Sequence, residues 1–153
     1  MKSEAHTEWQ DRMNAHQREG TPDQPQSGGI ITRGGKTILM VDDEVDILNI
    51  GRAVLEKFGY QVITAQSGEE ALTLYSEEAV DSVVLDLGMP GMGGINCLKE
   101  LLAKHKSARI VISSGYVSDD HMAEIMSQGA RAFLSKPFHI ENLVKTVRRV
   151  LDE

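Results

Sequence analysis

The segment that most constrains the fold of this chain is a short apolar run that ends in a carboxylate. Residues 82–86 read Ser-Val-Val-Leu-Asp, and a loop rich in Gly, Met and Pro follows over residues 87–94. Such a run is typical of a strand buried on both faces, and the glycines and Pro90 mark the turn that ends it. Asp86 is therefore predicted to lie at the carboxyl end of a central strand, where open α/β sheets bind their ligands.

Two further apolar runs end in charged side chains. One is followed by Asp42 and Asp43, and another is followed by Lys136. If the three runs are parallel strands of one sheet, their carboxyl ends lie at the same edge. We therefore expect these charged groups to meet Asp86 there.

Short apolar runs alternate with longer amphipathic segments from residue 37 onward. Strands are predicted at 37–42, 60–65, 82–86, 109–113 and 131–135, and helices at 45–58, 68–78, 94–104, 119–128 and 140–151. Five βα units in succession imply a doubly wound α/β fold, a five-stranded parallel sheet with helices on both faces. The order 2-1-3-4-5 would place the ends of the first and third strands side by side at the crevice where the order reverses.

Several helix boundaries are marked by local signals. Ser67 and Glu70 fit a capping box at the start of the second helix, and Ser118 can cap the fourth. Gly59 and Gly129 are placed to end the first and fourth helices. These signals support the helix ranges predicted from the apolar periodicity.

The composition suits one domain, with 153 residues of which 41% are hydrophobic and 25% charged. The net charge of −7 argues against nucleic acid or an anionic membrane as the main partner. Residues 1–36 carry five basic and five acidic side chains, so the net charge lies in residues 37–153. Because residues 21–35 are rich in Gly, Pro and Gln, we predict a flexible N-terminal segment or linker over 1–36 and a folded domain over 37–153.

The hydropathy of the chain bears on its cellular location, and its cysteine count bears on disulfides and zinc sites. The chain has no apolar run of transmembrane length and no signal peptide, so a cytoplasmic location is expected, without membrane insertion. Cys97 is the only cysteine, which excludes an internal disulfide and a cysteine-based zinc site. Its predicted role is that of a small buried hydrophobic residue in a helix.

Carboxylates gathered at one edge of a sheet repel one another, and a divalent cation relieves this repulsion. An all-oxygen ligand set suits Mg²⁺, with Mn²⁺ as the alternative, so Asp42, Asp43 and Asp86 are candidate metal ligands. Lys136 would supply a second positive charge, and Ser114 a hydroxyl. A carboxylate nucleophile, a metal, a lysine and a hydroxyl together predict phosphoryl transfer with aspartyl phosphate as the product.

The same residues resemble the receiver domain of two-component response regulators, the family of the bacterial chemotaxis receiver. Four stretches match its motifs in order and spacing: Val41-Asp42-Asp43-Glu44, residues 86–94, Ser114-Gly115 and Lys136-Pro137-Phe138. Each motif alone is weak, but four in register are specific. The resemblance covers roughly residues 37–152 and implies the flavodoxin-like (βα)5 fold.

The resemblance also implies a role for each matching residue. Asp86 resembles the phosphoacceptor. Asp42 and Asp43 resemble the acidic pair that holds Mg²⁺ together with Asp86 and the backbone carbonyl of Gly88. Lys136 resembles the lysine that contacts the phosphoryl group.

Two further positions correspond to the switch residues of the family. The hydroxyl residue that shifts toward the acyl phosphate is Ser113 or Ser114, and the small Gly115 that follows favours Ser114. Phe133 lies at the position of the switch aromatic, whose ring turns inward once the hydroxyl residue has moved. The resemblance also implies that Pro137 follows a cis peptide bond.

These residues also have plainer interpretations. Asp42 and Asp43 could simply cap the helix that follows them, and Lys136 could pair with a carboxylate for structural reasons alone. Ser114 could be an ordinary turn residue, and Phe133 an ordinary core aromatic. Phosphoryl transfer is preferred because it alone explains why charged groups end three different core strands.

Three functions follow from these patterns. The preferred one is a signalling switch, not an enzyme, in which Asp86 takes a phosphoryl group from a phosphohistidine and a partner-binding face then changes its affinity. A receiver-like interaction module that is never phosphorylated would not need the acidic pair, the acceptor and the lysine. A phosphatase of the haloacid dehalogenase type would need a second Asp where this chain has Gly88.

The implied partners are a histidine kinase or phosphotransfer domain upstream and a protein downstream, with a dimer as an open alternative. The resemblance places the downstream face on the predicted segments 119–128, 131–135 and 140–151. Because the sequence ends three residues after Val150, no output domain is expected to follow. The chain is then either a stand-alone receiver or the receiver of a hybrid histidine kinase.

Overall fold

The computed structural model describes residues 35–115 and 117–153. Its elements in chain order are β1 (Thr37–Val41), α3 (Val45–Lys57), β2 (Gln61–Ala65), α4 (Gly68–Leu74), β3 (Ser82–Asp86), α5 (Gly93–Lys104), β4 (Ile110–Ser114), α6 (Asp119–Ser127), β5 (Ala132–Ser135) and α7 (Ile140–Asp152). The predicted flexible segment over 1–36 lies outside the described residues except for its last two. Within the two described ranges, no helix is long and apolar enough to cross a membrane.

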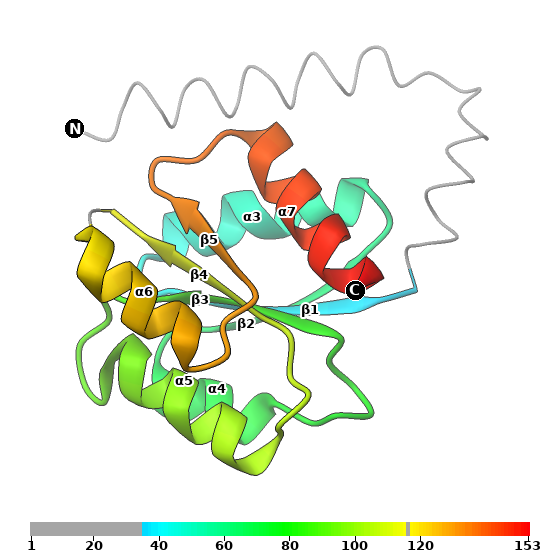
Figure 1. The fold of residues 1–153 in the computed structure, drawn as a ribbon. Helices are drawn as coiled ribbons and strands as arrows, with labels where there is room; N and C mark the ends of the chain where they lie inside the picture. The colour runs from blue at the N-terminus through cyan, green and yellow to red at the C-terminus, as the bar shows by residue number, and fades with distance from the viewer. Residues whose placement is uncertain (1–34, 116) are drawn as a thin grey trace, which may run out of the picture.

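The strands form one parallel sheet in the order β2-β1-β3-β4-β5, which confirms the predicted doubly wound fold. Helices α3 and α7 cover one face of the sheet, and α4, α5 and α6 cover the other (Figure 1). Strand β1 pairs with both β2 and β3, so the strand order reverses beside it. The carboxyl ends of β1 and β3 therefore flank the crevice where such sheets bind ligands.

Both faces of the sheet are packed. Strands β1, β3 and β4 contain only buried residues, as continuous apolar runs predict for the centre of a parallel sheet. Leu55 and Leu143 pack in the core under α3 and α7, while Leu98, Leu101 and Ile125 pack in the core under α4, α5 and α6. Burial of each such side chain stabilises the fold by roughly 2 kcal/mol. The packing on both faces therefore holds the strands, and with them the strand ends, in place.

The observed bounds agree with the predicted ones to within one residue, except in α4. The helix predicted over 68–78 ends at Leu74, because Tyr75 is extended, with φ −73° and ψ 137°. Ser76 then begins a separate turn, in which its hydroxyl accepts the Ala79 N–H at 3.3 Å. The prediction was wrong because a serine side chain offers the backbone an alternative to helical hydrogen bonds.

The local signals at the helix ends are confirmed. Ser67 and Ser118 cap α4 and α6, and each hydroxyl accepts the N–H of the residue three positions later. The Glu70 carboxylate completes the cap on α4 by accepting the backbone N–H of the residue before Ser67. Gly59 and Gly129 end their helices with φ 95° and 119°, in the left-handed region that favours glycine.

Cys97 is buried inside α5, as predicted, and burial raises the pKa of its thiol to about 11. At about pH 8 its thiolate fraction is then roughly 200-fold lower than that of an ordinary cysteine of pKa ~8.5. We expect alkylation by iodoacetamide to be at least that much slower in the folded protein than in denaturing urea, and to accelerate as the pH rises. Mass spectrometry of timed samples measures both rates. Equal rates would contradict a buried thiol.

Candidate functional site

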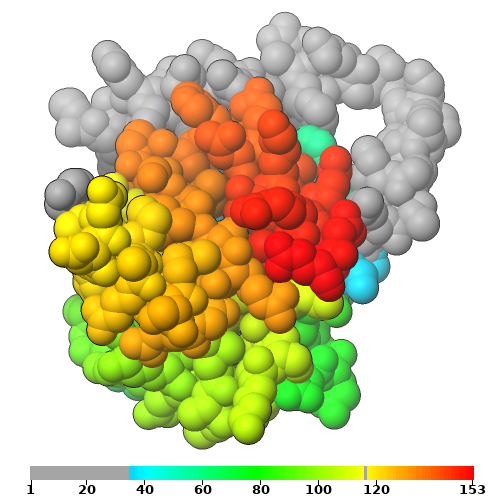
Figure 2. All heavy atoms as spheres, viewed as in Figure 1, coloured from blue at the N-terminus to red at the C-terminus, as the bar shows by residue number. Residues whose placement is uncertain are grey.

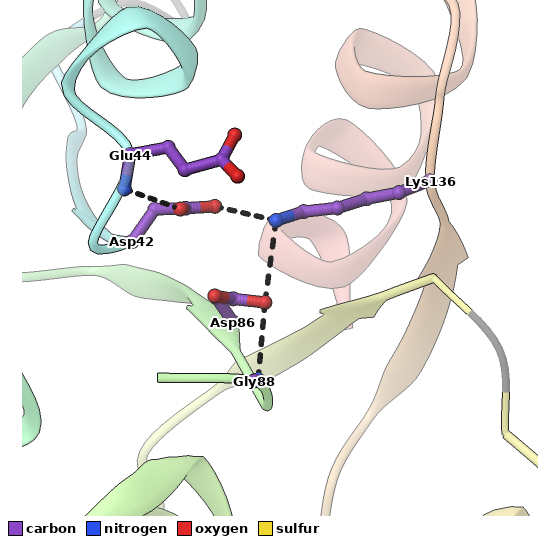
Figure 3. A network of polar contacts seen from close by, with 5 residues as sticks. All are labelled: Asp42, Glu44, Asp86, Gly88 and Lys136. Carbon is purple, nitrogen blue, oxygen red and sulfur yellow. Dashed lines mark hydrogen bonds and ion pairs between the residues drawn. The ribbon is translucent and has the colours of Figure 1, made fainter. Parts of the chain in front are cut away.

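The site lies where three strands end. Asp86 is the last residue of β3, Asp42 directly follows β1, and Lys136 directly follows β5. Their side chains point toward one another from these three strand ends (Figure 3). The structure thus brings together the charged groups that the strand pattern predicted to meet.

Lys136 joins two buried carboxylates. Its Nζ lies 2.7 Å from Asp42 Oδ2 and 3.2 Å from Asp86 Oδ1. Asp42 is 3% exposed and Asp86 is 5% exposed. Buried charges are costly unless they are paired and hydrogen-bonded, so the lysine offsets much of the cost of placing two carboxylates here.

Two backbone N–H groups orient these carboxylates. The Glu44 N–H donates to Asp42 Oδ1 at 2.9 Å, and the Gly88 N–H donates to Asp86 Oδ1 at 3.2 Å (Figure 3). Each donor lies two residues after its acceptor, in the loop that leaves the strand. The loops after β1 and β3 therefore hold the two carboxylates in fixed directions.

Asp43 completes an acidic cluster. One carboxylate oxygen from each of Asp42, Asp43 and Asp86 can be chosen so that all three lie within 4.8 Å of one another. Opposite ligands of an octahedral Mg²⁺ are about 4.2 Å apart, so this spacing needs little adjustment to hold the ion. Asp43 is exposed, which leaves one side of the cluster open to water and to an incoming ligand. The donor set fits a hard divalent cation such as Mg²⁺ or Mn²⁺.

The surroundings of the site favour the charged form of Lys136 and disfavour the charged form of Asp86. Burial and then the charge of Asp42 raise the pKa of Asp86, although Lys136 and the Gly88 N–H act in the opposite direction. Burial lowers the pKa of Lys136, but its hydrogen bond to Asp42 and the two carboxylate charges outweigh burial and raise it overall. The site therefore retains excess negative charge that a further cation would relieve.

The predicted switch residues lie on neighbouring strands. Strand β4 was predicted over 109–113 but ends at Ser114, whose carbonyl accepts the Lys136 N–H at 2.8 Å. Ser114 is buried, at 9% exposure, and Phe133 is half-buried in β5 against the core under α5 and α6. The Lys136–Pro137 peptide bond is cis, as the resemblance implies.

The two candidate hydroxyls differ in their surroundings. Ser113 is the register partner of Asp86, so the two residues share a face of the sheet, and its buried Oγ has no hydrogen-bond partner among the described residues. Ser114 lies on the opposite face, which it shares with Phe133. The preference for Ser114 as the switch hydroxyl stays a prediction.

Sequence patterns missed two contributors to the surroundings of the site. The Glu44 N–H orients Asp42, and the Glu69 carboxylate of α4 accepts the Met92 N–H from the loop after β3. The contact between Glu44 and Asp42 could be predicted only weakly, from the turn that must follow the strand. No local pattern signals the second, because its partners are 23 residues apart in sequence.

The chain is similar to several known proteins. The sequence profile described as response regulator receiver domain matches residues 38–148. Sporulation initiation phosphotransferase F of Bacillus subtilis is 35% identical over 114 residues, which cover 74% of this chain and 92% of that protein. The crystal structure of a CheY-like response regulator receiver domain protein from Methanospirillum hungatei has a TM-score of 0.72 at 28% identity, over 76% of this chain and 94% of that chain.

Other relatives are much longer than this chain. The sensor kinase CckA of Brucella abortus is 36% identical over 122 residues, which cover 78% of this chain and 13% of the kinase. The match to the transcriptional regulatory protein ZraR of Escherichia coli likewise spans only 27% of that protein. The profile match alone covers well over half of the sequence. The chain therefore belongs to the response regulator receiver domain family, the signalling switches of two-component systems.

Proposed function

We propose that Asp86 is the phosphoacceptor of a two-component phosphorelay, receiving a phosphoryl group from a phosphohistidine of a histidine kinase or phosphotransfer domain. One observation carries the proposal above all. Asp86 is a buried carboxylate at the carboxyl end of the central strand, held by Lys136 at 3.2 Å within an acidic cluster. A carboxylate held there for structure alone would not need Asp42 and Asp43 beside it.

The geometry favours one oxygen of Asp86 as the nucleophile. Lys136 and the Gly88 N–H both bind Oδ1, which leaves Oδ2 free of these two donors. Oδ2 attacks the phosphorus, a new P–O bond forms, and the P–N bond to the donor imidazole breaks with its electron pair passing to the ring nitrogen. Lys136 Nζ, no longer needed to balance a full negative charge on Asp86, then contacts the phosphoryl oxygens.

The acidic cluster is the proposed magnesium site. Asp42, Asp43 and Asp86 would hold the ion together with the backbone carbonyl of Gly88. When bound, Mg²⁺ offsets the negative charge of the transferring phosphoryl group. The chain's own contribution is to orient Asp42 and Asp86 through backbone N–H groups and to keep one side of the cluster open through the exposed Asp43.

The response to phosphorylation is proposed to run through Ser114 and Phe133. Drawing the Ser114 hydroxyl toward the acyl phosphate would open space for the Phe133 ring, which is half-buried in the resting protein. The face formed by α6, β5 and α7 would then change its affinity for a downstream partner. In the space-filling view these segments, yellow to red, form one continuous surface (Figure 2).

Residues 37–153 are proposed to form the receiver domain, with 1–36 as a flexible N-terminal segment or linker. The receiver is proposed to act either by itself or as part of a hybrid histidine kinase. Its relatives include sporulation initiation phosphotransferase F, of which the match covers 92%, and the sensor kinase CckA, of which it covers 13%. The domain is proposed to assist only its own phosphorylation and dephosphorylation, and to catalyse no other reaction. A downstream protein or a second copy of the chain would bind the responsive face.

Phosphoryl uptake from a small acyl phosphate tests the proposal. We expect the intact mass to rise by one phosphoryl group when the protein is incubated with acetyl phosphate and Mg²⁺. The gain should disappear with EDTA and in the Asp86→Asn variant, which keeps the size of the side chain but removes its nucleophilic charge. Asp81→Asn, which alters a carboxylate at the opposite end of the sheet, should be phosphorylated like the wild type.

Failure of the wild type to gain a phosphoryl group, with the fold intact and Mg²⁺ bound, would contradict the phosphoacceptor role. The interaction module that is never phosphorylated would then be the better description. Persistence of the gain in the Asp86→Asn variant would assign the acceptor to another residue.

A further inference from the structure

The Glu69 carboxylate of α4 lies against the loop that leaves Asp86. Its Oε2 accepts the Met92 N–H at 3.3 Å. A Cβ added to Gly91 would lie 3.3 Å and 3.4 Å from the two carboxylate oxygens, so the carboxylate also covers Gly91. Gly91 has φ 77°, a conformation that favours glycine. Glu69 therefore contacts two consecutive residues of this loop.

Helix α5 begins at this contact without a capping side chain of its own. Met92 is its N-cap residue, and no side chain caps the helix from that position. The first N–H groups of a helix have no partner inside the helix and carry partial positive charge, so an anionic acceptor stabilises them. Glu69 provides one from a different helix. It is not required for the start of α4, because Ser67 and Glu70 already cap that helix.

The start of α5 is in turn packed against the end of β3. A Cβ added to Gly94 would collide with the backbone carbonyl oxygen of Asp86, so the two backbones are in direct contact. Met89, in the loop between them, is 5% exposed. The loop is therefore held at three places: at Asp86, which accepts the Gly88 N–H, at the buried Met89, and at the Glu69 contact with Gly91 and Met92. Gly88 lies in the first part of this loop, between Asp86 and Met89.

We propose that Glu69 is a positioning residue for the metal and phosphoryl site. By capping α5 from α4, it would steady the loop whose Gly88 carbonyl is the proposed backbone ligand of Mg²⁺. The inference rests on the proposed function, because it assigns Glu69 to the same site. Mg²⁺ requires nearly octahedral ligands, and groups that orient metal ligands typically contribute about 10-fold or more in affinity.

Two variants of Glu69 distinguish the effect of its hydrogen bond to Met92 from the effect of its negative charge. Glu69→Ala removes both the acceptor and the negative charge, whereas Glu69→Gln removes the charge but keeps an oxygen that can accept the Met92 N–H. Glu100→Ala is the matched control, because it removes the same charge from an exposed position on α5. All three are studied in the full chain, with urea unfolding to establish that each is folded.

The test measures binding, local order and reaction separately. Titration calorimetry gives the Mg²⁺ dissociation constant, NMR gives amide hydrogen exchange at Gly88 and Met92, and intact mass gives phosphoryl uptake from acetyl phosphate. For Glu69→Ala we expect about 10-fold weaker Mg²⁺ binding and at least 10-fold faster exchange at Met92. Glu69→Gln should stay within about threefold of the wild type in both, and Glu100→Ala should match the wild type.

Three results would overturn the inference: unchanged Mg²⁺ affinity in Glu69→Ala, equal weakening in Glu69→Gln and Glu69→Ala, and no Mg²⁺ binding by the wild type. Equal weakening would assign the effect to charge rather than to the hydrogen bond. A wild type that binds Mg²⁺ but gains no phosphoryl group would contradict the phosphoacceptor role. The affinity and exchange differences would then still decide the role of Glu69.

Discussion

Replacing Lys136 with methionine is expected to lower the free energy of unfolding by about 3 kcal/mol in metal-free buffer. Methionine keeps the unbranched apolar stem of the side chain but removes the ammonium group, which leaves Asp42 and Asp86 with no lysine between them. Both carboxylates are almost fully buried, and removing one partner of a buried ion pair leaves the other charge uncompensated. Urea denaturation in EDTA, followed by circular dichroism, measures the loss.

Saturating Mg²⁺ should recover most of this loss in the Lys136→Met variant. The ion neutralises the same carboxylates and no longer competes with the lysine for them, so the variant should bind Mg²⁺ more tightly than the wild type. Phosphoryl uptake should nevertheless fall by at least about 100-fold, since no cation remains on the β5 side of the phosphoryl group.

Lys104→Met is the control for this prediction. Lys104 lies 4.0 Å from Glu100 in a pair that is more than half exposed, so its loss should change stability by less than about 0.5 kcal/mol. A loss below about 1 kcal/mol for Lys136→Met would contradict a buried ion pair at the site.

Replacing Gly94 with alanine is expected to destabilise the protein by about 3 kcal/mol, although alanine is the better helix former. Gly94 lies in the first turn of α5, and an added Cβ would collide with the Asp86 carbonyl oxygen and the Leu87 Cα. Neither atom belongs to a flexible side chain, so the helix or the strand end must move. Because Asp86 is at that strand end, phosphoryl uptake should fall as well.

Gly115→Ala provides the matched comparison. A Cβ at Gly115 has no described neighbour within 4 Å, and its φ is not in the left-handed region, so stability should change by less than about 0.5 kcal/mol. Urea unfolding of both variants gives the difference. A neutral or stabilising Gly94→Ala would show that α5 and β3 are not in close contact.

The order of apolar runs and charged residues was enough to predict the fold and which charged side chains lie together. Each central strand is a continuous apolar run, and continuous runs predict a sheet that is buried on both faces. A parallel sheet collects the carboxyl ends of its strands at one edge, so Asp42, Asp86 and Lys136 were predicted to meet without any distance being known. The one wrong helix end, after Leu74, arose where Ser76 offers a competing local turn.

Tertiary structure alone decided how these groups are held. The sequence does not indicate that Lys136 bonds both Asp42 and Asp86, or that burial and repulsion raise the pKa of Asp86. The two hydrogen bonds of Lys136 depend on distances of about 3 Å between residues that are 94 and 50 positions apart in sequence. The cap that Glu69 places on α5 is of the same kind. Strand pattern is a local property of the chain and can be read from it, whereas hydrogen bonds and electrostatic interactions between distant segments exist only once packing has set their separation.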